Sequence, residues 1–314
     1  MSDQPSTGPT TPASRSGGAM LVGGVIAVLA AFIAARVMGL GSGAEGGEGD
    51  EIATAGTDRE PTPDATATPD ADEAPRTPEP VVERLRVNVL HTYPHSPEAF
   101  TQGLLWHEGH LYESTGLYGE SSLRRVALET GEVLQRRAIE PRFFAEGLAR
   151  VGDRLFQLTW QEGETHVFGL DSFEPIRTFE HEGEGWGLCY DGARLVMSDG
   201  SARLFFRDPE SFELTRTVTV RQDGEPVDQL NELECVDGVV WANVWQTDRI
   251  LRIDPASGRV TGVVDARGLL TPEERREADV LNGIAWIPER GHFVITGKQW
   301  PHLFEVDFVA DARE

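Results

Sequence analysis

The residue with the clearest chemical potential in this sequence is Glu146. It lies in the stretch RFFAEGLARVGDRLFQLTW, two residues after the pair Phe143 and Phe144, and the stretch ends at Trp160. Aromatic neighbours desolvate a carboxyl group and raise its pKa, so the group can both accept and donate a proton near neutral pH. The pattern therefore indicates a general acid/base.

The same pattern of residues returns five times along the chain. The copies read FTQGLLWHEGHLYEST, FAEGLARVGDRLFQLTW, GWGLCYDGARLVMSDG, LNELECVDGVVWANVW and LNGIAWIPERGHFVITGK. Each is an apolar run, a turn rich in Gly, Asp or Pro, and a second apolar run, which is typical of a β-hairpin. Aligned on one shared Leu or Ile, the copies are spaced by 44, 40, 45 and 51 residues, as propeller blades are.

A second pair of apolar runs follows each of the first four copies, so a repeat has four strands. The fifth copy is one strand short, while an unpaired run, LRVNVLHTY, precedes the first copy. We expect that run to complete the last repeat and close the ring, which removes exposed sheet edges. The predicted fold is all-β, a five-bladed β-propeller over residues 84–314.

Two columns of residues emerge from the alignment of the copies. The first strand of a blade lies nearest the axis, so its beginning and the end of the second strand share one face. The first column is Gln102, Glu146, Trp186, Asn231 and Asn282, and the second is Gly116, Trp160, Gly200, Trp245 and Lys298. Indoles at a solvent-facing mouth are apolar area with no core to fill, so they indicate a binding pocket.

A purely structural interpretation of these columns stays open. Polar groups near a propeller axis often close the channel, so Gln102 and Asn282 would tie strands together and Lys298 would pair with Glu146. Phe100 and Phe144, each two residues before a member of the first column, would then be ordinary core residues.

Two smaller features complete the predicted propeller. The segment TPEERREA has Thr271 placed to cap a helix, Pro272 at its first position and Glu274 three residues after the cap, which predicts a short surface helix. Cys189 and Cys235, the two cysteines of the chain, lack metal-ligand spacing. Although a disulfide is conceivable in an exported protein, we expect two buried free thiols.

The N-terminal part of the chain differs sharply from the rest. Residues 1–18 are a polar tail, and residues 19–40 contain an uncharged apolar run that suits a transmembrane anchor or a signal segment. Residues 41–83 carry twelve Asp or Glu among Gly, Pro and Thr, which predicts a disordered acidic linker. We favour an uncleaved anchor with the propeller on the extracytoplasmic (periplasmic) side, or a secreted protein if the segment is cleaved.

The charge of the chain restricts its partners. The net charge is −24 and the sequence contains no basic stripe, so nucleic acid is excluded as a partner. We expect a monomer that is attached to a membrane by its N-terminal segment.

The motifs together resemble a known family. FTQGL, FAEGL, LTW, GWGL with SDG, LNELE with ANVW, LNGIAW and GKQWP follow one another as in the plant-type glutaminyl cyclases, or glutamine cyclotransferases, of plants and bacteria. The resemblance runs from about residue 91 to 308 and implies a five-bladed propeller. It also implies conversion of the N-terminal Gln of peptides into pyroglutamate with release of ammonia, without a catalytic zinc or other cofactor.

The resemblance assigns roles to residues of both columns. Glu146 matches the family's catalytic acid/base. The residues that match its substrate pocket are Phe100, Gln102, Phe144, Trp160, Trp186, Asn231, Trp245 and Lys298. Asn231, Gln102 and Lys298 are then the candidates to stabilise the tetrahedral oxygen.

Two other functions remain as alternatives. Glu146, Asp199, Asn231 and Asn282 offer oxygen ligands for a divalent cation, as in a metal-dependent, lactonase-like propeller. A propeller that docks a peptide without catalysis is the second alternative.

Overall fold

The structure is a computed structural model that describes residues 81–312. The predicted tail (1–18), apolar segment (19–40) and almost all of the linker (41–83) lie outside the described residues. Among residues 81–312, no helix has the length and apolar character of a membrane span. The regular structure is almost entirely β, in agreement with the predicted all-β class.

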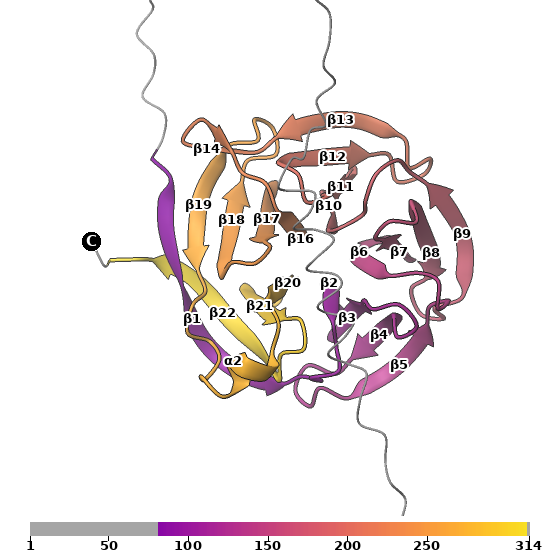
Figure 1. The fold of residues 1–314 in the computed structure, drawn as a ribbon, viewed down its shortest axis with the longest axis horizontal. Coiled ribbons are helices and arrows are strands. Elements are labelled where there is room, and N and C mark those ends of the chain that lie inside the picture. The colour runs from indigo at the N-terminus through magenta and orange to yellow at the C-terminus, as the bar shows by residue number, and fades with distance from the viewer. Residues whose placement is uncertain (1–80, 313–314) are drawn as a thin grey trace, which may run out of the picture. The chain divides into compact units, whose positions relative to one another are not determined.

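Three four-stranded sheets come first, and in each the strands pair in chain order (Figure 1). The first sheet contains β2 (Thr101–His107), β3 (His110–Thr115), β4 (Ser122–Val126) and β5 (Val133–Ala138). The second contains β6 (Ala145–Val151), β7 (Arg154–Thr159), β8 (Glu164–Gly169) and β9 (Pro175–Glu180). The third contains β10 (Leu188–Tyr190), β11 (Leu195–Met197), β12 (Arg203–Arg207) and β13 (Leu214–Thr219).

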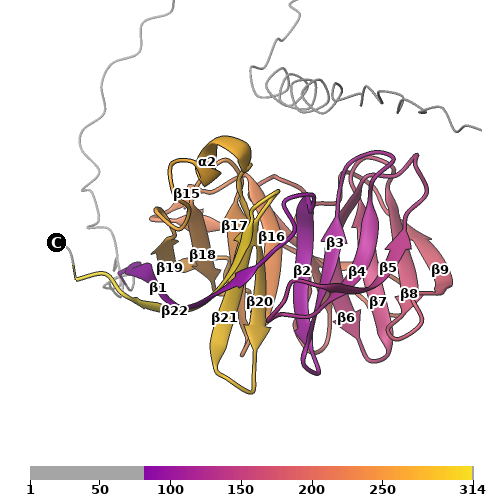
Figure 2. The same ribbon diagram turned by 90° about the horizontal axis from the view of Figure 1, so that it is seen from below.

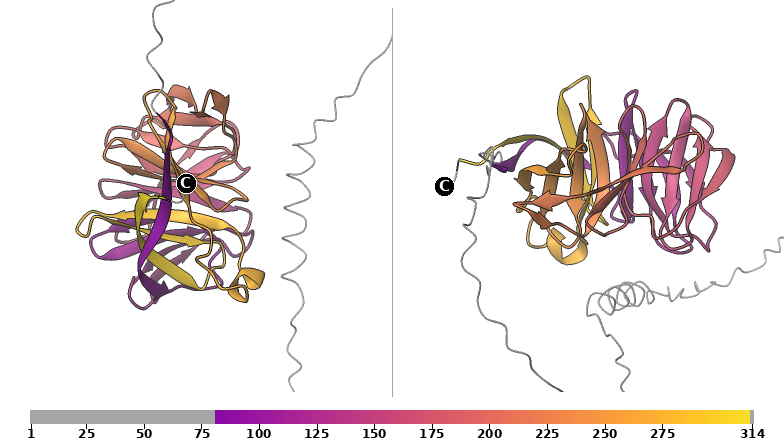
Figure 3. Two further views of the ribbon diagram at one scale, coloured as in Figure 1. Left: turned by 90° about the vertical axis from the view of Figure 1, so that its left-hand side faces the viewer. Right: turned by 90° about the horizontal axis from the view of Figure 1, so that it is seen from above.

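The fourth and fifth copies share one eight-stranded sheet. In spatial order its strands are β16 (Leu230–Val236), β17 (Val239–Val244), β18 (Arg249–Ile253), β19 (Val260–Asp265), β1 (Glu83–Pro94), β22 (His302–Ala310), β21 (His292–Gly297) and β20 (Leu281–Ile287). β1 pairs antiparallel with β22, as predicted for the run LRVNVLHTY. It also pairs in parallel with β19, which the sequence did not predict, and it runs along the outer side of the sheets (Figure 3).

The predicted turns connect the first two strands of the sheets. The dipeptides Glu108-Gly109 and Asp237-Gly238 have positive φ at both residues, which is the geometry of a tight two-residue hairpin turn. A further two-stranded sheet consists of β14 (Arg221–Gln222) and β15 (Glu225–Pro226).

The first strands of the sheets meet at the centre of the described residues. β2 contacts β6 and β20, and β10 contacts β6 and β16, while β16 also contacts β20. Glycine permits this approach, because a Cβ at Gly103 would lie 2.5 Å from the Leu148 nitrogen and one at Gly147 would lie 2.5 Å from the Leu188 nitrogen. The centre is therefore too narrow for side chains at these positions.

A buried carboxyl group replaces glycine in the fourth copy. Glu232 follows Asn231 where the other copies have Gly, and it is fully buried. Its two oxygens accept hydrogen bonds from the backbone N–H groups of Leu104 (3.2 Å) and Ile284 (2.8 Å). Burial and the nearby Glu234 carboxyl raise its pKa well above the usual value. Glu232 therefore ties β16 to both β2 and β20.

The predicted surface helix is present but very short. α2 (Glu274–Glu277) lies at the end of the sheets where β20 begins (Figure 2). Thr271 Oγ1 accepts the backbone N–H of Glu274 at 3.3 Å, and the Glu274 carboxylate accepts the backbone N–H of Thr271 at 2.8 Å. The reciprocal bonds of the predicted capping box are thus formed.

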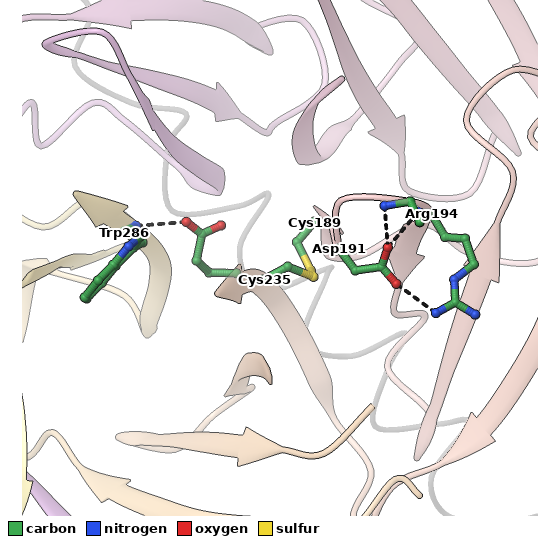
Figure 4. The surroundings of a disulfide bond; sticks show 7 residues. Cys189, Asp191, Arg194, Cys235 and Trp286 are labelled. Atoms are coloured by element: carbon green, nitrogen blue, oxygen red, sulfur yellow. Dashed lines mark hydrogen bonds and ion pairs between the residues drawn. A yellow bond between two sulfur atoms is a disulfide. The ribbon is translucent and has the colours of Figure 1, made fainter. Parts of the chain in front are cut away.

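The prediction of two free thiols is wrong. Cys189 in β10 and Cys235 in β16 form a disulfide that joins neighbouring first strands (Figure 4). The two cysteines are 46 residues apart in sequence, and the repeat brings them together because β10 and β16 are adjacent at the centre. Nearby, the Asp191 carboxylate accepts the backbone N–H of Arg194 and orders the hairpin turn.

Candidate active site

The predicted polar column lies where the sheet ladders are interrupted. Pairing between the first and second strands shifts register between Thr101 and Gly103 in β2 and between Ala145 and Leu148 in β6. Similar shifts occur in β16 and β20. A bulge leaves a residue outside the ladder and redirects its side chain, and bulges are common beside active sites. The interrupted positions are Gln102, Glu146, Asn231 and Asn282.

Glu146 is held by a chain of buried amides. It is 4% exposed, and its Oε1 accepts a hydrogen bond from Gln102 Nε2 at 2.8 Å. Asn282 Nδ2 donates to Gln102 Oε1 at 3.1 Å and to the Thr101 carbonyl at 3.0 Å. Asn282 therefore orients Gln102, and Gln102 in turn orients the carboxyl group.

The surroundings of Glu146 keep a proton on it more readily than water does. Burial raises its pKa well above the usual value for glutamic acid. The ammonium group of Lys298 lowers this pKa, while the carboxylates of Glu184 and Glu162 raise it further. Burial dominates, so the pKa is raised, as the sequence predicted.

Lys298 is the cation that lowers the pKa of Glu146, and it faces an aromatic ring. It is 4% exposed, and its Nζ lies 4.9 Å from the centroid of the Phe100 ring. Burial lowers its pKa, whereas Glu146 and Asp279 act in the opposite direction. Backbone bonds to Val280 and Asp279 fix the position of this residue just after β21.

The aromatic residues predicted to line the substrate pocket fall into two groups. In the first, Phe144 packs edge-on against Phe100, Tyr118 and Trp160, with ring centroids 6.0, 5.4 and 5.6 Å away. In the second, Trp186 packs edge-on against Trp245 at 5.8 Å. These geometries are those that aromatic pairs prefer.

The walls are more enclosed than the sequence suggested. Trp160 and Trp186 are 7% and 8% exposed, so they are not open rings at a mouth, while Trp245 is half-buried. Glycine makes room for them in the second column. A Cβ at Gly116 would lie 2.4 Å from Phe144 Cε1, and one at Gly200 would lie 2.7 Å from Trp186 Cζ2.

Asn231 presents an acceptor to the pocket region. Its side chain is almost fully buried, and within the described residues its Oδ1 has no hydrogen-bond partner. Its backbone carbonyl accepts a bond from Ser198 Oγ at 2.7 Å, and Ser198 Oγ in turn accepts the N–H of Gly187. This arrangement places Asn231 next to the Trp186 segment. A buried acceptor without a partner is a natural contact for a ligand N–H group.

Comparison with known proteins identifies the family of this chain. A family model described as Glutamine cyclotransferase matches residues 64–308. The chain belongs to the glutamine cyclotransferase family. It is 42% identical over 226 residues to the glutaminyl-peptide cyclotransferase of Arabidopsis thaliana, a match that covers 70% of each chain.

A solved structure of the same family is also similar. The crystal structure of Myxococcus xanthus glutaminyl cyclase matches with 43% identity and a TM-score of 0.67, and the match covers 74% of this chain and 100% of that one. At this identity the likeness extends beyond fold to the family's residue pattern. The resemblance stated from the motifs is thus confirmed.

Asp199, one of the ligands of the alternative metal site, is already engaged by protein groups. The Asp199 carboxylate bonds to the backbone N–H of Ser201 at 3.0 Å and forms an ion pair with Arg203 at 3.6 Å. Asn282 donates from its Nδ2 to Gln102 and to the Thr101 carbonyl, so these bonds leave its oxygen aside. Across residues 81–312, no group of three or more His, Cys, Asp or Glu side chains has the arrangement of a metal site.

Three residues near the pocket were missed by the sequence reasoning. Tyr118 packs on Phe144 and donates from its hydroxyl to Glu162 Oε1 at 2.8 Å. Glu184 accepts hydrogen bonds from two pocket indoles. Alignment on strand positions omits Tyr118, Glu162 and Glu184, because they lie in the segments between strands. The sequence offered one signal for Glu184, which lies two residues before Trp186 in GEGWGL.

Proposed function

We propose that this chain cyclises the N-terminal Gln of peptides to pyroglutamate and releases ammonia, with Glu146 as the proton shuttle. Membership of the glutamine cyclotransferase family establishes the activity class. The observation that supports the shuttle is a buried carboxyl group with a raised pKa, held by Gln102 beside an aromatic wall. The substrates are peptides or proteins that begin with Gln.

The reaction is an intramolecular acyl transfer. The substrate's α-amine attacks the carbon of its own side-chain amide, so a new C–N bond closes a five-membered lactam ring, and the bond to the amide nitrogen breaks. The nucleophile is tethered, so the site must fold the side chain and move protons. We assign the folding to the walls formed by Trp160, Trp186 and Trp245.

Glu146 then moves one proton in two steps. Its carboxylate takes a proton from the attacking α-amine and donates it to the departing nitrogen, which leaves as ammonia. The raised pKa favours the first transfer, because a carboxylate with an ordinary pKa is a weak base and would take the α-amine proton less readily. The carboxylate is regenerated as the charged base for the next turnover.

We assign different substrate contacts to Lys298 and Asn231. The Nε2 group of Gln102 is engaged by Glu146, so Lys298 is the better donor for the tetrahedral oxygen. The free Oδ1 of Asn231 suits an N–H group of the substrate. Of the three candidates that the sequence left open, this proposal selects Lys298 as the group that stabilises the tetrahedral oxygen.

We assign the architecture as a five-bladed β-propeller. Three four-stranded meanders account for three blades, and the eight-stranded sheet accounts for two that β1 joins by pairing with both β19 and β22. The contacts among first strands support a closed ring. β1 then acts as the strand that completes the last blade.

The disulfide supports an extracytoplasmic location for the catalytic domain. Disulfides persist mainly in oxidising compartments, and Cys189–Cys235 joins two first strands, with Cys189 buried and Cys235 partly buried. We propose that residues 19–40 anchor the protein to the membrane and that the catalytic domain is monomeric. N-terminal sequencing of the native protein tests the first point and light scattering tests the second, since cleavage after residue 40 or a dimeric mass would contradict them.

The decisive experiment measures ammonia release from a peptide that begins with Gln. Wild-type protein is expected to release ammonia faster than the spontaneous reaction, and Glu146→Gln to lower kcat by about 100-fold or more while retaining the fold. Glu182→Gln, a carboxyl group at an exposed position outside the proton path, is the matched control. Near wild-type turnover in Glu146→Gln would remove the shuttle assignment.

A further inference from the structure

Glu184 joins the two aromatic groups of the pocket through a single oxygen. Its Oε2 accepts a hydrogen bond from Trp160 Nε1 at 2.9 Å and another from Trp186 Nε1 at 3.1 Å. Trp160 belongs to the group around Phe144, and Trp186 packs on Trp245. The carboxylate thus fixes the relative orientation of two walls that come from different sheets.

The backbone around Glu184 is built to hold it at this seam. The N–H of Gly185 donates to the Trp160 carbonyl at 2.9 Å, so the segment that precedes β10 docks against the end of β7. A Cβ at Gly185 would lie 2.6 Å from the Thr159 carbonyl oxygen, so only glycine permits this approach. Glu184 is therefore directed at both indoles by its own main chain.

The chemistry of the two bonds favours a carboxylate. An indole N–H is a donor only, and both indoles here are more than nine-tenths buried, so each needs an acceptor. A charged acceptor makes a shorter and stronger bond than a neutral one, and one oxygen has the lone pairs for two donors. Gln161 Nε2 reaches the other oxygen, Oε1, at 3.5 Å.

We propose that Glu184 is a positioning residue that holds Trp160 and Trp186 as the opposed walls against which the substrate's Gln side chain folds. This role rests on the proposed function. The walls contact the substrate before and during the reaction, so loss of their orientation weakens ground-state and transition-state binding alike. The Glu184 charge also raises the pKa of Glu146, so the assay is run at a pH above that raised pKa, where Glu146 is the base with or without this charge and its proton transfer is affected much less.

The test compares four variants of the purified full-length protein in the ammonia-release assay. Glu184→Ala removes both acceptors, and it is expected to raise KM about tenfold and to change kcat by less than about threefold. Glu184→Gln keeps an acceptor oxygen at the same reach but makes weaker, neutral bonds, so its KM is expected to lie between those of wild type and Glu184→Ala. Glu184→Asp keeps the charge but shortens the reach, so it is expected to resemble Glu184→Ala. Glu182→Ala, at an exposed position of the same loop, is the control.

The outcomes separate this proposal from the proposed function. A wild-type KM in Glu184→Ala would overturn the positioning role, and so would a Glu184→Gln variant as impaired as Glu184→Ala, because charge rather than hydrogen bonding would then be responsible. If Glu184→Ala fails to fold, Glu184→Asp against Glu184→Gln decides the same question. Wild-type protein that released no ammonia would refute the proposed function, and the role of Glu184 with it.

Discussion

Removal of the Cys189–Cys235 disulfide gives a sharp test of how the centre is stabilised. The bond closes a loop of 46 residues and joins β10 to β16. A cross-link over that length restricts the unfolded chain and contributes about 4 kcal/mol to the free energy of unfolding. For a domain of this size, 1 kcal/mol corresponds to roughly 2–4 °C, so the melting temperature is expected to fall by roughly 8–16 °C.

The assay is thermal unfolding, followed by circular dichroism, of a double variant with Cys189→Ala and Cys235→Ala. Alanine suits both sites because Cys189 is 2% exposed among apolar neighbours. A reducing agent is expected to lower the melting temperature of the wild type to that of the variant and to leave the variant unchanged. A fall of less than about 3 °C would refute the reasoning, since the loop-closure term would then be absent.

Three other predictions concern the site. Activity is expected to fall as the pH is lowered through the raised pKa of Glu146, because the base form is then lost. Glu162→Gln removes a charge that raises this pKa, so the acidic limb of the kcat/KM profile is expected to move to lower pH. An acidic limb that stays in place would contradict the electrostatic account. Gln102→Leu removes the hydrogen bond to the Glu146 carboxylate and is expected to lower kcat by about 10-fold to 100-fold in steady-state assays. An unchanged kcat would show that Glu146 does not need Gln102 to be oriented. Gly116→Ala places a Cβ 2.4 Å from the Phe144 ring, so the free energy of unfolding, measured with denaturant, is expected to fall by about 1–3 kcal/mol. Wild-type stability in this variant would mean that the ring has space to move.

The repeat made much of the fold predictable from sequence. Hairpin turns such as Asp237-Gly238 require residues that accept positive φ, so they are visible in the sequence. The alignment of the copies then placed Gln102 and Glu146 in one column, and the structure joins them by a hydrogen bond. Periodicity is informative here because each copy solves the same local packing problem.

Contacts between the copies were harder to predict. The repeat places β10 beside β16, but it does not show which side chains on neighbouring strands face each other, so the pairing of Cys189 with Cys235 was missed. Glu232 offered a signal that was not used. Four copies have Gly directly after the column residue, and the one copy with a Glu at that place carries the buried link between β2, β16 and β20.

The hydrogen-bond partner of Glu146 is neutral, and this explains why burial gives Glu146 a raised pKa that is useful in catalysis. Glu113 is buried to a similar degree, with 2% of its surface exposed against 4% for Glu146. Burial acts to raise the pKa of Glu113, but the opposing effects of His95, Arg124 and Thr101 outweigh it, so this pKa is lowered. Such a carboxylate holds a structure together but does not accept protons readily.

Glu146 receives a hydrogen bond from an amide instead. Gln102 orients the carboxyl group without adding a positive charge, so the effect of burial persists and the pKa stays high. Lys298 is the one cation that lowers this pKa, and it acts through its charge while it lies over the Phe100 ring. A cationic partner at position 102 would orient the carboxylate equally well but lower its pKa, so it would accept the proton of the attacking α-amine less readily. The site therefore needs an amide at position 102, a requirement that burial alone does not impose.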